Sequence, residues 1–179
     1  MNVTVFCGST SGSPAYQQAA ETLGKWIAEQ GHTLVYGGGD SGLMGIVAKT
    51  AFEGGSPVVG VLPGNVELIT SRPQPYVTEL ITAKDMTERK RIMEERADAF
   101  IALPGGIGTL DEMTEVITLC KLGLYDKKCV MYDRNGFYEP FKAMIGQMEK
   151  DAFLPELDFL LFSDDINEID AFLKEGKDL

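Results

Sequence analysis

Short apolar runs alternate with longer amphipathic stretches along the whole chain. The apolar runs predict strands at 3–7, 33–36, 57–62, 78–82, 99–103 and 128–132. The stretches between them predict helices near 14–29, 41–53, 86–97, 109–122, 137–150 and 164–174. Runs this short and this continuously apolar are typical of strands buried on both faces, as in a parallel sheet. The alternation therefore predicts a doubly wound, Rossmann-like α/β fold, with a mostly parallel sheet and helices on both faces.

No feature of the sequence divides it into two domains. Segment 63–77, with three prolines, is the only sizeable irregular loop that the pattern predicts. We therefore expect residues 1–179 to form a single domain. The chain enters its first strand without the basic start of a signal peptide, and no apolar run approaches the ~18 residues of a membrane span. These features predict a cytoplasmic protein that is not bound to membranes.

Composition excludes several kinds of chemistry. The formal net charge of −11 opposes a nucleic-acid binder, which needs a basic face, but not a small anion in a local positive pocket. The irregular spacing of Cys7, Cys120 and Cys129 predicts buried free thiols in a reducing compartment rather than disulfides or a zinc site. His32 is the only histidine, which excludes Ser-His-Asp and Cys-His mechanisms and a histidine-rich metal site. Any proton transfer must then use carboxylates, and we expect no metal and no cofactor.

Glycines stand directly after three of the predicted strands. They occur in Gly8-Ser9-Thr10-Ser11 after the first, Gly37-Gly38-Gly39 after the second and Gly105-Gly106-Ile107-Gly108 after the fifth. Because the carboxyl ends of parallel strands share one edge, where ligands bind, we expect one pocket there, with Ser9, Gly38 and Gly39 among its binding residues. The run from Gly37 to Gly42 also fits the G-x-G-x-x-G dinucleotide fingerprint. That match is weak, because the run follows the second strand and no acidic residue ends the next one.

The turn after the fifth strand is the most informative stretch. Glycines there expose backbone N–H groups just before an amphipathic helix, which favours an anion such as phosphate. The candidates for phosphate binding are Gly105, Gly106, Ile107, Gly108 and Thr109. Glu112 follows in the first turn of the predicted helix. Its spacing from Thr109 fits a capping box with Thr109 as N-cap, whereas an acid beside a phosphate site fits catalysis, and spacing alone leaves both roles open.

Two cations interrupt the apolar face of the helix predicted near 86–97. At helical spacing, Met86, Arg89, Lys90, Met93 and Ala97 share that face. A cation there can extend to water or meet an anion at the pocket. Arginine in particular offers a planar fork for phosphate or carboxylate. Arg89 and Lys90 are therefore candidate binding residues.

The run Pro104-Gly105-Gly106-Ile107-Gly108-Thr109-Leu110-Asp111-Glu112 resembles the PGGxGTxxE signature of the LOG (Lonely Guy) family. Matching motifs follow in family order at 6–9, 36–39, 42–45, 59–63, 86–90 and 136–138, so the resemblance covers most of the chain. Members are cytokinin riboside 5′-monophosphate phosphoribohydrolases, long mislabelled as lysine decarboxylases. The resemblance implies a nucleotide-binding hydrolase of cytokinin biosynthesis, generally a homodimer with sites near the subunit boundary.

The resemblance also implies roles for individual residues. Glu112 and Arg89 are implied as catalytic, Lys90 as the second member of a substrate-binding Arg-Lys pair, and Thr118 as a further binding position. The sequence departs from the family at Thr87, where the Met-His-x-Arg-Lys motif has histidine. The loop after 63 is also short, so that Glu67 aligns only loosely with a substrate contact. Both departures bear on base preference more than on reaction type.

Residues and resemblance together predict hydrolysis of the N-glycosidic bond of AMP, or of an N6-substituted AMP, to the free base and ribose 5-phosphate. The 105–109 loop is expected to hold the phosphate, Glu112 to stabilise positive charge at C1′ and direct water, and Arg89 to position the substrate or stabilise the departing base. One alternative is a nucleotide-binding sensor or carrier without turnover. Another is a PLP-dependent lysine decarboxylase, for which Lys90 is the nearest lysine.

The helix predicted at 109–122 has a broad apolar face that one sheet layer covers only in part. The face comprises Leu110, Met113, Val116, Ile117, Leu119 and Cys120, followed by Leu122 and Leu124. The excess predicts a homodimer in which this helix and the 86–97 helix contribute to the interface. On this interpretation Val116 and Ile117 are interface residues.

Overall fold

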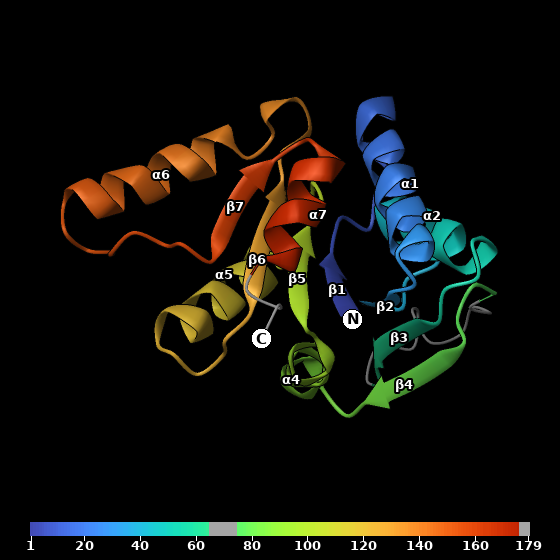
Figure 1. The fold of residues 1–179 in the computed structure, drawn as a ribbon. Helices are drawn as coiled ribbons and strands as arrows, with labels where there is room; N and C mark the ends of the chain where they lie inside the picture. Colours follow the sequence, from blue (N-terminus) through green and yellow to red (C-terminus); the bar gives the residue numbers. More distant parts are fainter. Residues whose placement is uncertain (65–74, 176–179) are drawn as a thin grey trace.

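A parallel sheet of seven strands forms the centre of the computed structural model, which describes residues 1–64 and 75–175 (Figure 1). The strands are β1 (Asn2–Phe6), β2 (Thr33–Tyr36), β3 (Val58–Pro63), β4 (Glu79–Ala83), β5 (Ala99–Ala102), β6 (Lys128–Tyr132) and β7 (Leu160–Ser163). Their order is β4-β3-β2-β1-β5-β6-β7, and each neighbouring pair is parallel. The predicted doubly wound α/β fold is confirmed.

Helices cover both faces of this sheet. They are α1 (Pro14–Glu29), α2 (Gly42–Glu53), α4 (Met86–Arg96), α5 (Ile107–Lys121), α6 (Glu139–Lys150) and α7 (Ile166–Lys174), with a 3₁₀ turn η1 (Arg134–Gly136). Apolar side chains of α1, α2 and α7 pack in one cluster with one face of the sheet. Those of α4, α5 and α6 pack in a second cluster on the other face. The sheet is therefore buried on both sides, as its continuously apolar strands predict.

Strand β7 is missing from the sequence prediction, which placed six strands. Its residues Leu160 to Phe162 form an apolar run, but a short one that polar residues follow at once. β7 pairs only with β6, with Leu160 opposite Cys129, and three of its four residues are only partly buried. Pairing with β6 at the edge of the sheet therefore defines this strand more than its local pattern does.

The order in which the chain adds strands to the sheet reverses at its centre. β1 pairs with β2 on one side and with β5 on the other, so the strand order reverses between β1 and β5. The turns beyond these strands contact one another: the amide of Gly8 donates to the carbonyl of Pro104 at 3.1 Å, and the amide of Leu43 donates to the carbonyl of Gly8 at 3.2 Å. The glycine turns thus meet at one edge, at the switch point where open α/β sheets bind ligands.

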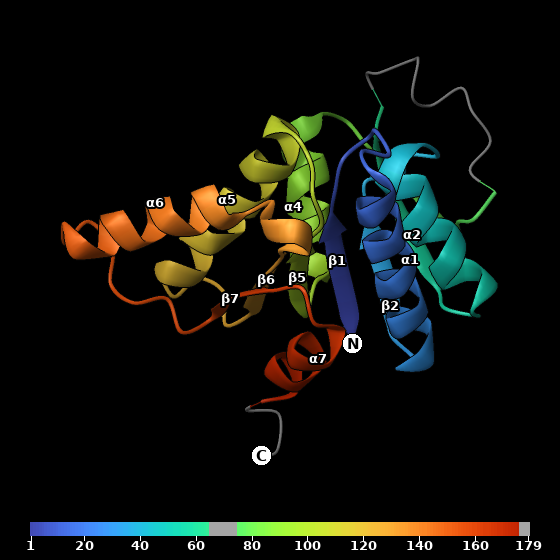
Figure 2. The same ribbon diagram turned by 90° about the horizontal axis from the view of Figure 1, so that it is seen from above.

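The rest of the chain buries part of α5 but no residue of α6 completely. Val116 and Ile117, the expected interface residues, are buried in this chain's own core, so that placement is wrong. Exposed apolar side chains lie instead at Leu122 and Leu124, directly after α5, and at Met144 on α6. α6 extends outward beyond β7 and has no fully buried residue (Figures 1 and 2). The uncovered apolar surface therefore lies at the end of α5 and along α6.

The structure also locates the three cysteines, His32 and part of segment 63–77. All three cysteines are buried free thiols, as predicted. His32 precedes β2 and lies at the amino edge of the sheet, opposite the glycine turns. Most of segment 63–77, including Glu67, lies outside the described residues. Within the described ranges, no helix combines the length and apolar character needed to cross a bilayer.

Candidate active site

A cavity of about 240 Å³ lies at the carboxyl edge of the sheet, where the turns after β1 and β5 face α4. Its lining comprises Val5, Phe6, Cys7, Gly8, Ser9, Gly37, Met44, Met86, Arg89, Met93, Gly106, Gly108, Thr109 and Glu112. The cavity therefore brings together Arg89 from α4, Glu112 from α5 and the backbone between these helices.

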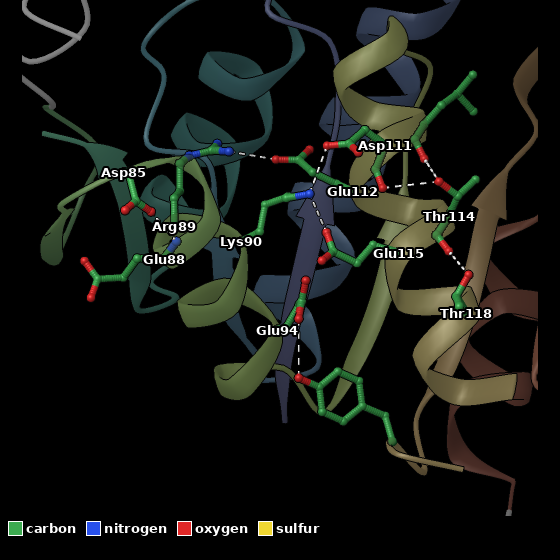
Figure 3. A network of polar contacts seen from close by, with 12 residues as sticks. Asp85, Glu88, Arg89, Lys90, Glu94, Asp111, Glu112, Thr114, Glu115 and Thr118 are labelled. Carbon is green, nitrogen blue, oxygen red and sulfur yellow. Dashed lines mark hydrogen bonds and ion pairs between the residues drawn. The ribbon is translucent and has the colours of Figure 1, made fainter. Parts of the chain in front are cut away.

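Arg89 and Glu112 form a direct pair in this cavity (Figure 3). Nη1 of Arg89 donates to Oε1 of Glu112 at 2.7 Å, and Nε of Arg89 donates to the carbonyl of Val61 at 2.9 Å. The two side chains are only 10% and 12% exposed. Burial raises the pKa of the Glu112 carboxyl above its ordinary value, while the charge and hydrogen bond of Arg89 act in the opposite direction. The result is a mostly buried carboxylate whose charge depends on one arginine.

Helix α5 begins earlier than predicted. Gly106 is its N-cap with extended backbone, φ −93° and ψ −160°, and its carbonyl accepts the amide of Leu110 at 3.2 Å. Thr109 is therefore inside the helix and is not its N-cap. Glu112 is the sixth residue of the helix, six positions after the N-cap Gly106 and three beyond the N3 position from which a capping box closes. The capping interpretation of Glu112 is wrong, and its partner in the structure is Arg89.

The N-terminus of α5 suits an anion. No side chain caps this helix, so its first N–H groups stay available to a ligand. A Cβ added at Gly106 or Gly108 would meet nothing within 4 Å, whereas one at Gly105 would lie 2.1 Å from Oγ1 of the buried Thr109. Ile107 is 82% exposed and lies outside the cavity lining. Backbone, rather than side chains, therefore forms this wall of the cavity.

Lys90 and Thr118 lie outside the cavity lining (Figure 3). Nζ of Lys90 contacts Asp111 at 3.1 Å and Glu115 at 2.5 Å, so it joins α4 to α5. These partners, the hydrogen bond to Glu115 foremost, raise the pKa of Lys90. Oγ1 of Thr118 donates to the carbonyl of Thr114 at 2.7 Å, further along α5 than Glu112.

The glycines predicted after β2 have a different place. Gly38 adopts a left-handed φ of +73°, and a Cβ there would lie 2.8 Å from the side chain of Leu62. Gly38 and Gly39 are absent from the lining, whereas Gly37 is part of it. The structure thus brings Ser9 together with Arg89, Glu112, Gly106, Gly108 and Thr109. It leaves four predicted binding residues outside the cavity lining, namely Gly38, Gly39, Gly105 and Ile107.

Sequence reasoning did not single out several of the lining residues. Met86 and Met93 share the helix face of Arg89, and that pattern was the available signal. Cys7 lines the cavity directly after β1, where burial and the neighbouring Glu112 raise the pKa of its thiol. A protonated thiol is a poor nucleophile, so Cys7 contributes packing rather than chemistry. Glu112 is the acidic side chain in the lining of this cavity.

A larger hollow of about 460 Å³ lies at the opposite, amino edge of the sheet. Its lining includes Asp98, Lys127 and Asp158, but no glycine turn and no helix N-terminus. Within residues 1–64 and 75–175, no three histidine, cysteine or acidic side chains are grouped so as to hold a metal ion. The smaller cavity at the switch point is therefore the candidate active site.

In overall fold the chain is similar to solved structures of cofactor-binding proteins. The molybdenum cofactor binding protein of Rippkaea orientalis superposes with a TM-score of 0.70 at 20% identity, covering 95% of each chain. The Moco carrier protein of Chlamydomonas reinhardtii gives a TM-score of 0.69 at 22% identity, covering 96% of each chain. At these identities the likeness establishes the fold alone.

Sequence comparison gives closer relatives. A family profile described as "Possible lysine decarboxylase" matches residues 44–170. The chain is 45% identical over 157 residues to the cytokinin riboside 5′-monophosphate phosphoribohydrolase LOG of Oryza sativa subsp. japonica, covering 86% of this chain and 64% of that protein. It is 44% identical over 154 residues to the cytokinin riboside 5′-monophosphate phosphoribohydrolase of Rhodococcoides fascians, covering 86% and 78%. With a profile over most of its length and relatives above 40% identity, this chain belongs to the LOG family.

Proposed function

We propose that this protein hydrolyses the N-glycosidic bond of AMP, or of an N6-substituted cytokinin AMP, to give the free base and ribose 5-phosphate. One observation carries the proposal: the buried Arg89–Glu112 pair, 2.7 Å between Nη1 and Oε1, shares a cavity with the uncapped N-terminus of α5. The names of the related proteins support the same reaction. Residues 1–179 form one domain in this proposal.

The α5 N-terminus holds the 5′-phosphate of the substrate. Backbone N–H groups and the positive end of the helix dipole converge there. The open space at Gly106 and Gly108 lets a phosphate approach the backbone closely. Fixing the phosphate fixes C1′ relative to Glu112, which is the positioning that makes an attack by water efficient.

Glu112 performs the chemistry at C1′. As the C1′–N bond breaks, its electron pair leaves with the base and the sugar acquires oxocarbenium character. The ionised carboxylate stabilises that positive charge and accepts a proton from the water that attacks C1′. That proton then passes to the departing base, so that the free base leaves neutral and Glu112 is ionised again. Arg89 lowers the pKa of Glu112 against the effect of burial and thereby favours the ionised form, and in the proposal it stabilises negative charge on the departing base.

Two other functions fit the site less well. A carrier needs the phosphate-binding turn alone, and that turn gives no reason to bury a carboxylate and an arginine together. A PLP-dependent decarboxylase needs a lysine amine at the cavity. In the described part of the chain no lysine lines the cavity, and Lys90 is held as an ammonium ion by Asp111 and Glu115.

The same proposal places the enzyme in the cytoplasm as a homodimer. Three buried free thiols suit a reducing compartment. The exposed apolar side chains of Leu122, Leu124 and Met144 offer a surface for a second copy of the chain. Because α5 carries both Glu112 and the start of this surface, the site lies near the subunit boundary.

The decisive experiment incubates the purified protein with AMP and follows adenine and ribose 5-phosphate by chromatography. We expect both products in equal amounts, and a Glu112→Gln variant that turns over about 10²–10⁴-fold more slowly while still binding AMP. Asp111→Asn is the matched control, since it removes a charge one residue away and outside the cavity. It should keep activity within a few-fold. Binding of AMP without any adenine release would favour the carrier.

Base preference is tested by the same assay with a panel of nucleotides. AMP, isopentenyl-AMP, GMP and CMP share the phosphate that α5 binds and differ only in the base. We expect cleavage of AMP or isopentenyl-AMP to exceed that of GMP and CMP. Equal cleavage of all four would contradict the assignment of an adenine nucleotide as substrate.

A further inference from the structure

Gly37 lies in the candidate active site, at the carboxyl end of β2 and against the guanidinium of Arg89. A Cβ added at Gly37 would lie 2.1 Å from Nη2 of Arg89, with Sδ of Met44 next at 3.2 Å. Real Cβ atoms essentially never approach a heavy atom within 3.0 Å. The φ of Gly37 is outside the left-handed region, so its backbone suits any residue. Space alone therefore requires glycine at this position.

The guanidinium has little freedom to move aside. Its Nε is bound to the carbonyl of Val61 at 2.9 Å, and its Nη1 is bound to Glu112 at 2.7 Å. Because the guanidinium is planar and rigid, these two bonds determine where Nη2 lies. The Cβ of any side chain at position 37 would overlap with Nη2 there. Arg89 can avoid such a side chain only by giving up one or both bonds.

We propose that Gly37 is a positioning residue for the hydrolysis: its missing side chain provides the space in which Arg89 binds Val61 and Glu112 at once. The inference rests on the proposed function for its kinetic consequences, and on the contacts above for its geometry. Neighbouring glycines have other tasks, since Gly38 supplies a positive φ and a Cβ at Gly39 would first meet the flexible end of Met44. No dinucleotide is needed to explain this glycine.

The substitution Gly37→Ala should separate catalysis from stability. The atom in conflict is the far end of a long side chain rather than backbone, so the chain can fold with Arg89 displaced. Glu112 then stays buried but loses the charge and hydrogen bond that lower its pKa. Its pKa rises further, and the acid limb of the pH–rate profile moves to higher pH.

The kinetic experiment compares Gly37→Ala with the wild type in kcat, KM for AMP and Tm. We expect kcat to fall about 10- to 100-fold with a change of a few degrees in Tm. In an Arg89→Ala background, Gly37→Ala should cause no further loss, because the displaced group is absent. Gly54→Ala is the matched control: its Cβ would lie 2.4 Å from Cβ of Ala28, far from the cavity. It should lower Tm and leave the pH profile in place.

A second measurement needs no turnover. Carbon-13 NMR of labelled glutamate carboxyls, with the Glu112 signal assigned from Glu112→Gln, gives the pKa of Glu112 without nucleotide. We expect a higher pKa in Gly37→Ala than in the wild type and no change in Gly54→Ala. An unchanged Glu112 pKa, or equal losses from Gly37→Ala with and without Arg89, would overturn the role of Gly37. If the wild type does not cleave AMP, the proposed hydrolysis is refuted. The titration of Glu112 would then still test whether Gly37 positions Arg89.

Discussion

Asp111 and Glu112 are neighbours in sequence, yet they occupy opposite environments. Successive residues of a helix point about 100° apart, so the side chain of Asp111 is 61% exposed and that of Glu112 only 12%. Asp111 joins Lys90 in a contact between α4 and α5, while Glu112 faces the cavity with Arg89. Two adjacent positions of one helix thus hold a surface ion pair and the buried carboxylate of the candidate site.

Burial of Glu112 predicts a specific dependence of stability on pH. Its folded-state pKa is raised, so between the unfolded value of about 4.3 and the folded value the native state binds more protons than the unfolded state. The contribution of Glu112 to stability is therefore fully present below the unfolded pKa and is lost as pH rises through the folded pKa. The free energy of unfolding of the wild type minus that of Glu112→Gln should fall over this range.

Urea unfolding of both proteins between pH 4 and pH 8 measures this difference. The absolute stability of Glu112→Gln also reflects the loss of a charged partner for Arg89, so the slope with pH, rather than the level, is the test. A difference that rises with pH would mean that Arg89 outweighs burial and that the pKa of Glu112 is lowered instead.

Sequence reasoning identified Arg89 and Glu112 but misjudged their contacts. The motif singled out both residues, and the helix face at 86–97 placed Arg89 toward the interior. Whether Glu112 capped its own helix depended on where that helix begins, and the structure places the N-cap at Gly106 rather than at Thr109. A pairing between residues on two different helices, such as Arg89 with Glu112, is invisible to local spacing.

At the scale of elements, the start of α5 is the part of the site that binding depends on. Because the helix begins at Ile107 rather than after Thr109, its free N–H groups lie beside the cavity and ahead of Glu112. A ligand at this N-terminus is therefore held at one fixed distance from the carboxylate. In the proposed function, the helix serves at once as phosphate site and as support for Glu112.

This arrangement predicts that AMP is cleaved far faster than adenosine, even when both saturate the enzyme. The reason is that binding energy from the phosphate positions C1′ against Glu112, and loss of that energy lowers kcat as well as affinity. Initial rates over a range of concentrations of both compounds give kcat and KM separately. Equal kcat values with different KM values would show that the phosphate contributes to affinity alone.

Most elements follow from the local pattern, and the exception is instructive. Buried strands such as β3 and β5 are continuous apolar runs with clear ends. β7 is shorter in its apolar part and only partly buried, because it has a neighbour on one side. An edge strand is defined by the strand it pairs with, and that information is absent from a single short window of sequence.

For the whole molecule, the uncovered surface at α5 and α6 predicts a homodimer. Leu122 is 63% exposed and Met144 57% exposed. α6 lies outside the compact part of the structure in both views (Figures 1 and 2). A stable dimer buries at least about 1,200 Å² in total, and packing against a second copy would remove these exposed side chains from water.

Light scattering at micromolar concentration tests the dimer. We expect a mass near twice the 19.5 kDa of one chain, and a Met144→Asp variant that shifts toward a single chain without losing Tm. Leu80→Asp is the matched control, because Leu80 is 50% exposed but lies on β4, at the other edge of the sheet. A wild-type mass near 19.5 kDa, or equal effects of both variants, would contradict an interface at α6.

The contact between the turns after β1 and β5 also determines when the site can exist during folding. β1 pairs with β5 in a register that sets Val3 against Ala99, so the two strands meet only after a long stretch of chain has formed. Arg89 belongs to the half of the chain that precedes β5, and Glu112 to the half that follows it. A nascent chain that has emerged only as far as α4 therefore carries the arginine without its acid. The Arg89–Glu112 pair can form only once closure of this long loop, the slow kind of step in folding, has joined the two halves.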